Sequence, residues 1–201
     1  FTDTCGDSSN KSVYNITNTA KFAADSIIFR GNSGIEAVNT AGSNRNVIEF
    51  SGAGMTEIYA VSEGLAATDI YGEIIGGKAV DLERTDLIFN NDAVLVGKNL
   101  TAQGVSATNN YWLKAVSLGE ESTLTAKKDF TLVADGGYYN TGLHVWGQSL
   151  AQFNGKTNIV VKNGVDTARA VYVYDNVDGT TKAEFKDDLT ISTAGSAADY
   201  L

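Results

Sequence analysis

The residues of this chain best able to do acid–base chemistry are an adjacent pair of carboxylates, Asp187 and Asp188. Cleavage of a glycosidic bond uses two acids held at a fixed separation, so such a pair is a candidate for that reaction. In the internal repeats described below, however, the equivalent positions are Lys128–Asp129 and Gly155–Lys156. Because the residue types change between repeats, we interpret the pair as a solvated turn and predict no catalytic residue.

The single histidine, His144, stands between Leu143 and Val145. Apolar residues on both sides place it on the outward side of a period-2 strand, where we expect it to be exposed. No serine or cysteine motif supplies it with a nucleophile, so a catalytic triad is not predicted.

Metal and cofactor sites are also not predicted. The stretch "YDNVDGT" at 174–180 resembles part of a calcium loop, but it lacks the alternating acids and the distal glutamate. One cysteine, Cys5, excludes an internal disulfide framework and a cysteine-rich zinc site, and its role stays open. A net charge of −9 argues against nucleic acid as a partner. No apolar run is long enough for a membrane-spanning helix.

Aromatic residues form the strongest candidate for a binding surface. If side chains alternate along the strands as expected, the histidine and three aromatic residues of two neighbouring repeats project from one face. Two tyrosines lie in the preceding turn, and a lysine lies beside the group. A group of rings can hold a sugar or a partner's apolar surface. The alternative is that the rings pack in the core or form a ladder along the sheet. The predicted ligand-binding residues are His144, Trp146, Tyr172, Tyr174, Tyr138, Tyr139 and Lys114.

The absence of proline indicates which kind of secondary structure positions these residues. The 201 residues include no proline, although 21 are glycine. Proline lacks the N–H that a central strand donates to its neighbour, so it is restricted to edges, turns and bulges. Frequent turns without proline indicate strands that are paired on both sides almost everywhere.

A repeated pattern supplies the period. One phrase places Leu100, Phe130, Thr157 and Leu189 in a common slot, 27 to 32 residues apart. A second phrase aligns Leu113, Leu143 and Val171, with Ile35, Ile58 and Val80 as earlier members, and gives His144 the equivalents Glu36, Tyr59, Lys114 and Tyr172. A threonine column of Thr101, Thr131 and Thr190 follows the first slot, interrupted by Asn158.

Strand-type alternation with a period of 20 to 30 residues predicts an all-β, right-handed parallel β-helix of roughly seven coils. Identical slots would stack from coil to coil, which explains why the phrases recur. We expect residues 1–20 to be an N-terminal segment or cap and 21–201 to be the β-helix. The register between residues 84 and 98 stays open, because "AVLVGK" also fits the slot of the second phrase.

Phrases such as "LTAQGVSATNNYWLKAVSLG" and "FTLVADGGYYNTGLHVWGQ" resemble the passenger domains of bacterial pertactin-like autotransporters. The resemblance covers about residues 20–201. It implies a passenger fragment that is secreted or displayed on the bacterial surface, with a membrane barrel outside this sequence as its only membrane contact. The sequence has no initiator methionine and no obvious polar cap after "AADYL". We therefore expect a longer natural protein, truncated here at the C-terminus, with a signal peptide or an artificial boundary just upstream.

The expected function is therefore that of a non-enzymatic adhesin, or a stalk for one. Its partners would be glycans or proteins of host or bacterial cells or of the matrix, with self-association as a further mode. Two alternatives remain: a polysaccharide-active lyase or hydrolase, and a purely structural spacer.

Overall fold

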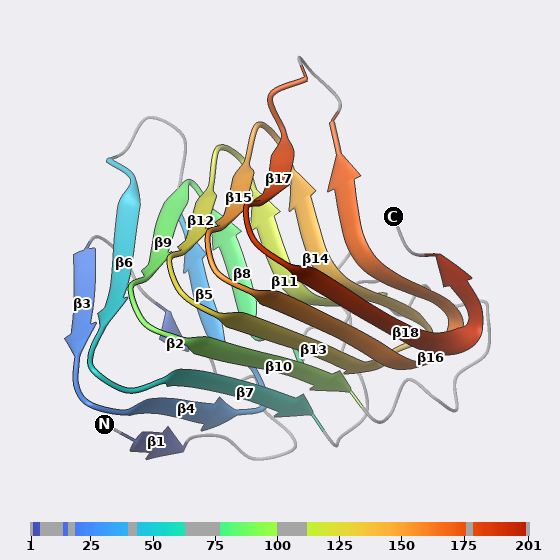
Figure 1. Ribbon diagram of the computed structural model, residues 1–201, viewed down its shortest axis with the longest axis horizontal. Coiled ribbons are helices and arrows are strands. Elements are labelled where there is room, and N and C mark those ends of the chain that lie inside the picture. Colours follow the sequence, from blue (N-terminus) through green and yellow to red (C-terminus); the bar gives the residue numbers. More distant parts are fainter. Residues whose placement is uncertain are drawn as a thin grey trace.

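The computed structural model describes residues 2–4, 14–15, 19–39, 44–62, 77–99, 112–175 and 179–199. Within these ranges every regular element is a β-strand, and every strand pair is parallel (Figure 1). Successive strands turn through three faces and then repeat, so strands far apart in sequence lie side by side. The predicted fold class, an all-β parallel β-helix, is confirmed.

Each face is a ladder of stacked strands. Face 1 contains β3 (Thr19–Ala23), β6 (Asn46–Ser51), β9 (Thr85–Phe89), β12 (Thr123–Ala126), β15 (Leu150–Phe153) and β17 (Lys182–Phe185). Face 2 contains β1 (Thr2–Thr4), β4 (Ile27–Gly31), β7 (Thr56–Ser62), β10 (Ala93–Asn99), β13 (Phe130–Gly136), the first part of β16 (Thr157–Tyr174) and the first part of β18 (Leu189–Asp199).

Face 3 contains β2 (Tyr14–Asn15), β5 (Ile35–Val38), β8 (Val80–Glu83), β11 (Trp112–Gly119), β14 (Tyr139–Trp146) and the second part of β16. The end of β18 continues onto this face beside β16. Face 2 therefore stacks seven strands within the described residues, which agrees with the predicted number of coils. The ladder already includes β1 and β2, which lie inside the segment 1–20.

The register of face 3 differs in part from the prediction. Leu143 pairs with Val171 as expected, but the residue beside Leu143 on the preceding coil is Val116, not Leu113. Leu113 pairs with Asn140 instead. The reason is that β11 contains two consecutive triplets with apolar outer members, Leu113-Lys114-Ala115 and Val116-Ser117-Leu118, and the sequence alone does not show which one pairs with Leu143.

The column continues backwards through Val80 to Ile35, as predicted for these two residues. Ile58 is not a member. It lies on face 2, where it pairs with Phe29 and Leu95. The coil between Ile35 and Val80 is therefore one long turn and not two short ones.

A small residue precedes each member of this column, where the chain bends from face 2 to face 3. These residues are Gly34, Ala79, Ala115, Gly142 and Ala170. A Cβ atom on Gly34 would lie 2.0 Å from the carbonyl oxygen of Ala79, and one on Gly142 would lie 2.7 Å from that of Ala170. Close approach of the stacked chains therefore requires small side chains here, and they mark the true register.

On face 2, the open register between 84 and 98 is settled by Ala93, which pairs with Phe130. Thr157 and Leu189 follow in the same column, as predicted. The placement of Leu100 in this slot was wrong, and so was that of Thr101, whose expected position beside Thr131 is taken by Val94. Leu100 and Thr101 themselves lie outside the described residues.

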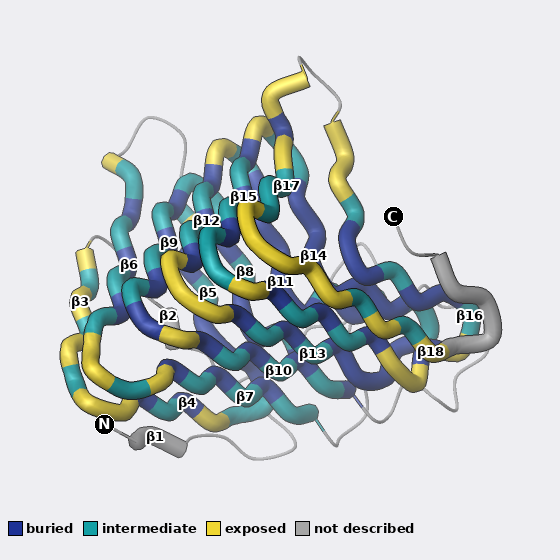
Figure 2. The backbone as a smooth tube through the Cα atoms, viewed as in Figure 1, coloured by how far each residue is buried: buried dark blue, intermediate teal, exposed yellow. Residues whose placement is uncertain are grey.

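The interior carries a phenylalanine ladder that the repeat analysis missed. Phe22, Phe50 and Phe89 stack at centroid distances of 5.0 and 5.1 Å, and Phe153 stacks on Phe185 at 4.9 Å. The remaining position of this face 1 column is Ala126. Phe130, from face 2, fills the gap and contacts Phe89 at 5.9 Å and Phe153 at 5.0 Å. Figure 2 shows buried residues alternating with more exposed ones along the strands.

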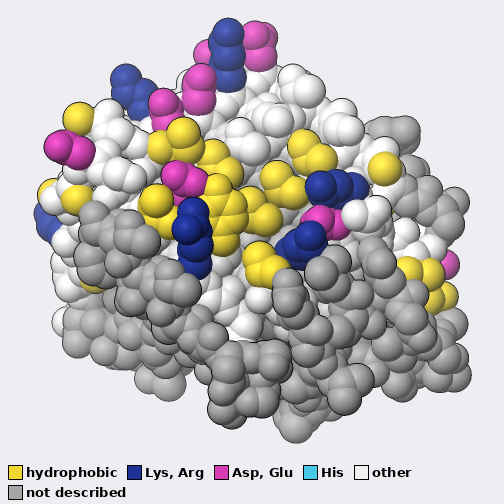
Figure 3. Space-filling model, turned by 90° about the horizontal axis from the view of Figure 1, so that it is seen from below, with side chains coloured by type: hydrophobic (Ala, Val, Ile, Leu, Met, Phe, Trp, Pro, Cys, Tyr) yellow, Lys and Arg dark blue, Asp and Glu magenta, His cyan; other side chains and the backbone are white. Residues whose placement is uncertain are grey.

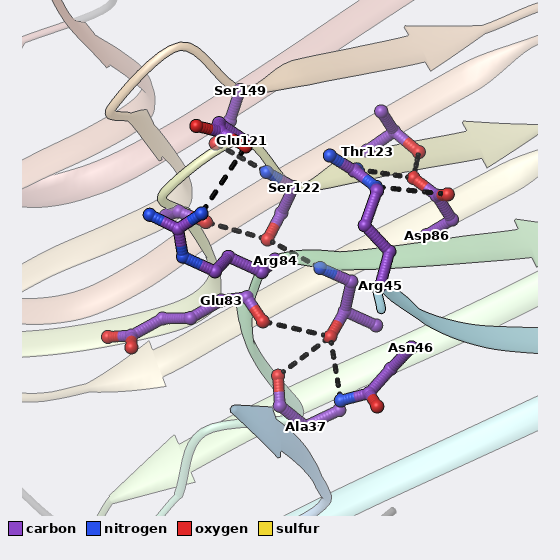
Figure 4. A network of polar contacts seen from close by, with 12 residues as sticks. Ala37, Arg45, Asn46, Glu83, Arg84, Asp86, Glu121, Ser122, Thr123 and Ser149 are labelled. Atoms are coloured by element: carbon purple, nitrogen blue, oxygen red, sulfur yellow. Dashed lines mark hydrogen bonds and ion pairs between the residues drawn. The ribbon is translucent and has the colours of Figure 1, made fainter. Parts of the chain in front are cut away.

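Hydroxyl groups form a second ladder where face 3 turns into face 1 (Figure 4). The backbone N–H of Thr85 donates to Ser122 Oγ at 3.3 Å, and that of Ser122 donates to Ser149 Oγ at 3.1 Å. The hydroxyl of Ser122 in turn donates to the Gly119 carbonyl oxygen at 2.6 Å. All three side chains are buried, so these bonds satisfy backbone groups that water does not reach.

Aspartates have the same use at the turn from face 1 to face 2. Asp92 Oδ1 accepts a hydrogen bond from the N–H of Asp129, and Asp129 Oδ1 accepts one from the N–H of Lys156. Asp187 and Asp188 occupy the equivalent exposed turn of a later coil. Their predicted interpretation as turn residues is confirmed by this position.

Candidate binding face

The outward side chains of face 3 fall into two adjacent columns along the helix axis. Column A consists of Glu36, Asp81, Ser117, His144 and Tyr172. Column B consists of Val38, Glu83, Gly119, Trp146 and Tyr174. The carboxylates Glu36, Asp81 and Glu83 lie in the early coils and the rings lie in the later coils, so the face has an acidic half and an aromatic half.

Column A places two predicted site residues in direct contact. The rings of His144 and Tyr172 stack with centroids 5.3 Å apart and an angle of 15° between their planes. Tyr172 also lies 6.3 Å from Tyr174. His144 is only 7% exposed, so the expectation of an exposed strand residue was wrong. Rings on neighbouring strands cover one another, and alternation along a strand does not reveal this.

Trp146 in column B lies over Gly119 on the preceding coil. A Cβ atom built on Gly119 would fall 2.4 Å from both Cε2 and Cζ2 of the indole and 2.7 Å from Nε1. Any side chain at this position would therefore displace the ring. The glycine provides the space in which the indole rests on the sheet.

The two tyrosines of the preceding turn belong to a second ring cluster. Tyr139 stacks on Trp112 with centroids 4.6 Å apart, and Tyr138 meets Tyr139 edge-on at 4.9 Å. Partial burial, followed by the charge of Asp166 and the neighbouring Tyr139, raises the pKa of the Tyr138 hydroxyl.

Arg169 joins the two ring clusters. Its guanidinium carbon lies 5.7 Å from the centre of the Trp112 ring and 4.9 Å from that of Tyr172. Both distances are within the range of a cation–π interaction. The aromatic half of face 3 is therefore one connected surface.

Lys114 does not take the place that the sequence analysis gave it. It pairs with Thr141, and the residue in register with His144 on that coil is Ser117. Tyr59, another expected equivalent of His144, lies on face 2 beside Arg30 and Val96. The error at Lys114 follows from the three-residue slip at Leu113, and the error at Tyr59 follows from the placement of β7 on face 2.

The acidic half was not recognised from the sequence. Burial raises the pKa of Glu83, and the charges of Glu120, Asp81 and Glu36 raise it further, in that order. Lys78 Nζ lies 3.1 Å from Asp81 Oδ2, and Arg84 Nε lies 3.4 Å from Glu120 Oε2. These two cations each compensate a neighbour of Glu83, and the Lys78 charge offsets the repulsion at Glu83 only in part.

Sequence reasoning also missed Trp112, Arg169 and Gly119. The signal that could have found them is the small residue before each aliphatic one, as in Ala115-Val116 and Gly142-Leu143. Aligning on those pairs places Arg169 in register with Thr141, and Gly119 opposite Trp146.

Face 2 has a different outer surface, seen from below in Figure 3, where apolar side chains gather between charged ones and no described histidine is visible. Val96, Val133 and Val160 form one outward column. Asp135 lies between Lys98 at 3.4 Å and Lys162 at 3.7 Å. These three charges are thus paired within the face.

The described residues contain no group of three or more histidine, cysteine or acidic side chains arranged to hold a metal. They also contain no helix long and apolar enough to cross a membrane. The stretch 174–180 lies partly outside the described residues. Comparison of the chain with protein-family models, with curated proteins and with solved structures finds no match.

Proposed function

We propose that this protein is a secreted or surface-displayed bacterial β-helix that acts as an adhesin or as the stalk of one. The observation that carries the proposal is the connected aromatic surface of face 3, from Tyr138 to Tyr174. Clusters of outward aromatic side chains on an otherwise polar surface mark binding sites for sugars or protein partners.

The mechanism is the display of repeated contacts by a stiff scaffold. Strands in successive coils lie about 4.8 Å apart, so outward side chains form straight columns whose spacing is fixed by backbone hydrogen bonds. Weak contacts along such a column add when a ligand engages several of them at once. Little ordering of the protein is then required when the ligand binds.

Binding of the purified chain to glycans, matrix proteins and whole cells tests the proposal. Trp146→Ala and Tyr174→Ala should each reduce binding, whereas Tyr59→Ala on face 2 should leave it unchanged. If the two face 3 variants bind as well as the wild type, face 3 is not the adhesive surface and the proposal fails.

A second candidate function is cleavage of a polysaccharide. The observation that favours it is the group of carboxylates on face 3, in which Glu83 has a raised pKa and Asp81 lies in the adjacent column. A carboxyl with a raised pKa is better suited than an ordinary one to donate a proton to a leaving oxygen. Release of reducing ends from a glycan panel by the wild type, and its loss in Glu83→Gln, would identify this activity. If the wild type releases no reducing ends, the adhesin proposal is the one that stands.

A further inference from the structure

Trp146 offers a flat apolar surface on the outside of face 3. Three of its ring atoms lie at nearly equal distances, 2.4 to 2.7 Å, from the point where a Gly119 Cβ would be. The ring therefore lies over Gly119, and Trp146 is partly exposed. Tyr174, the next residue of column B, is 48% exposed. The other rings of this face stack on one another, so their faces are mutually covered.

Glu83 and Trp146 lie on either side of Gly119 in column B, and the indole leans over that glycine. The Glu83 backbone is therefore about 4.8 Å from the strand over which the ring rests. The Trp146 surface and the Glu83 carboxylate are thus within reach of one small ring-shaped group.

The charges around Glu83 call for a cation. Three carboxylates face it: Glu36 from β5, Asp81 from β8 and Glu120 after β11. The basic residues nearby pair with other acids, since Lys78 contacts Asp81, and Arg84 contacts Glu120 and Glu121. Within the described part of the chain, Glu83 has no cation of its own at ion-pair distance. A partly buried carboxylate in this setting is stabilised by a positive charge supplied from outside.

We infer that Trp146 and Glu83 form a site for a sugar ring that carries a protonated amino group. The apolar side of the ring would stack on the indole, and the ammonium would donate a charge-assisted hydrogen bond to Glu83. Glu36 and Asp81 would add attraction at longer range, and they would repel uronic acids. This inference rests on the proposed function and names its ligand class.

Calorimetric titration of the full chain with three probes tests the site: a glucosamine hexamer, its N-acetylated counterpart and an oligogalacturonate. The glucosamine hexamer should bind at least ten times more tightly than the acetylated one, because acetylation removes the charge. The oligogalacturonate should not bind. Raising the salt concentration should weaken the glucosamine complex much more than the acetylated one.

Matched variants separate the two parts of the site. Glu83→Gln should weaken glucosamine binding about tenfold or more, which corresponds to loss of one charge-assisted hydrogen bond, and should leave the acetylated probe unaffected. Trp146→Ala should weaken both probes, and Trp146→Phe should restore part of the loss. Glu57→Gln on face 2 is the charge-matched control and should change neither.

Equal affinity for the acetylated hexamer, or binding of the oligogalacturonate, would overturn the inference. Binding of a lysine-rich peptide in place of every sugar would overturn it in favour of a protein partner. If no probe binds but cell adhesion persists and falls in Trp146→Ala, the ligand class is wrong and the adhesin proposal stands. If the wild type binds neither the probes nor cells, both the ligand class and the adhesin proposal are refuted.

Discussion

Two sets of aromatic rings are stacked along this β-helix, one inside it and one on face 3. Inside, Phe22 to Phe185 are enclosed by the three faces, and the rings contact other apolar groups. Outside, the stacked rings of His144 and Tyr172 are bordered by Arg169 and by Ser117. The same spacing of about 4.8 Å produces both sets. What differs is the surroundings, and these decide whether a ladder supplies stability or a binding surface.

The inner ladder should give the largest effect when it is broken. Phe130→Ala removes the ring that fills the space beside Ala126, and the stacked sheets around it cannot close the gap. We expect the free energy of unfolding to fall by about 3–5 kcal/mol, as for other buried aromatic residues. Urea denaturation measures this change. Tyr172→Ala, which shortens the outer ladder, should cost much less, and an equal loss would contradict the distinction between the two ladders.

The corner that separates the two ladders depends on buried hydroxyls. Ser122→Ala removes the acceptor for the Thr85 N–H and leaves that group buried without a partner. The expected loss of stability is about 1–3 kcal/mol. Thr125→Ala, on the outward side of the same strand β12, is the control and should change stability by less than about 0.5 kcal/mol. Equal losses in the two variants would refute the role of the hydroxyl ladder.

The outer ladder should respond to a change that leaves the core intact. Gly119→Ala places a methyl group where the Trp146 indole lies, so the ring must move away from the sheet. We expect a stability loss of about 1 kcal/mol, because a surface side chain can shift more easily than a core one. The tryptophan emission should shift to longer wavelength as the indole becomes more hydrated. In a Trp146→Phe background, where Trp112 is the remaining tryptophan, Gly119→Ala should leave the emission spectrum unchanged. An unshifted emission spectrum would mean that the indole does not rest on Gly119.

The smallest expected effect concerns the acidic half of face 3. Because the pKa of Glu83 is raised in the folded protein, its ionised form is destabilised there relative to the unfolded chain. The folded state binds more protons between the unfolded and folded pKa values, so stability falls as pH rises through that window. Glu83→Gln should therefore stabilise the protein at pH 7, by less than about 1 kcal/mol since water screens the partly exposed group.

That gain should vanish below the unfolded pKa of Glu83, where both states are protonated. Thermal unfolding at about pH 7 and about pH 3.5, either side of the ordinary glutamate pKa, measures the difference. Glu57→Gln, whose carboxylate accepts a hydrogen bond from the Tyr59 hydroxyl, should not reproduce the pattern. A variant that is less stable than the wild type at pH 7 would show that Glu83 is compensated by its neighbours.

The fold could be predicted because its signals are local. Missing proline, abundant glycine and period-2 alternation all reflect strands paired on both sides. The columns Leu143–Val171 and Phe130–Thr157–Leu189 could be predicted as well, since the intervening turns have similar lengths. The prediction of a bacterial surface adhesin follows from the resemblance and not from these signals, and it stays a proposal.

The errors at Leu113 and Lys114 have one physical origin. In the coil before Leu143 the chain between faces 2 and 3 is longer, so a constant spacing slips from Val116 to Leu113. A period-2 pattern has no marker that distinguishes one inward triplet from the next. The slip then carried Lys114 to the wrong column and hid Arg169. Phe130 was assigned to a face 2 column without its contact to the face 1 ladder, because inter-sheet packing leaves no trace in sequence spacing.

The register of face 3 is the basis of columns A and B, and paired cysteines test it most directly. In a Cys5→Ser background, Ser117→Cys with His144→Cys places two thiols on adjacent residues of neighbouring coils, at a separation that suits a disulfide. The control pair is Lys114→Cys with His144→Cys, which a constant repeat spacing would bring together. We predict rapid disulfide formation in the first pair and none in the second. A disulfide in the Lys114 pair alone would contradict the register and, with it, the binding face.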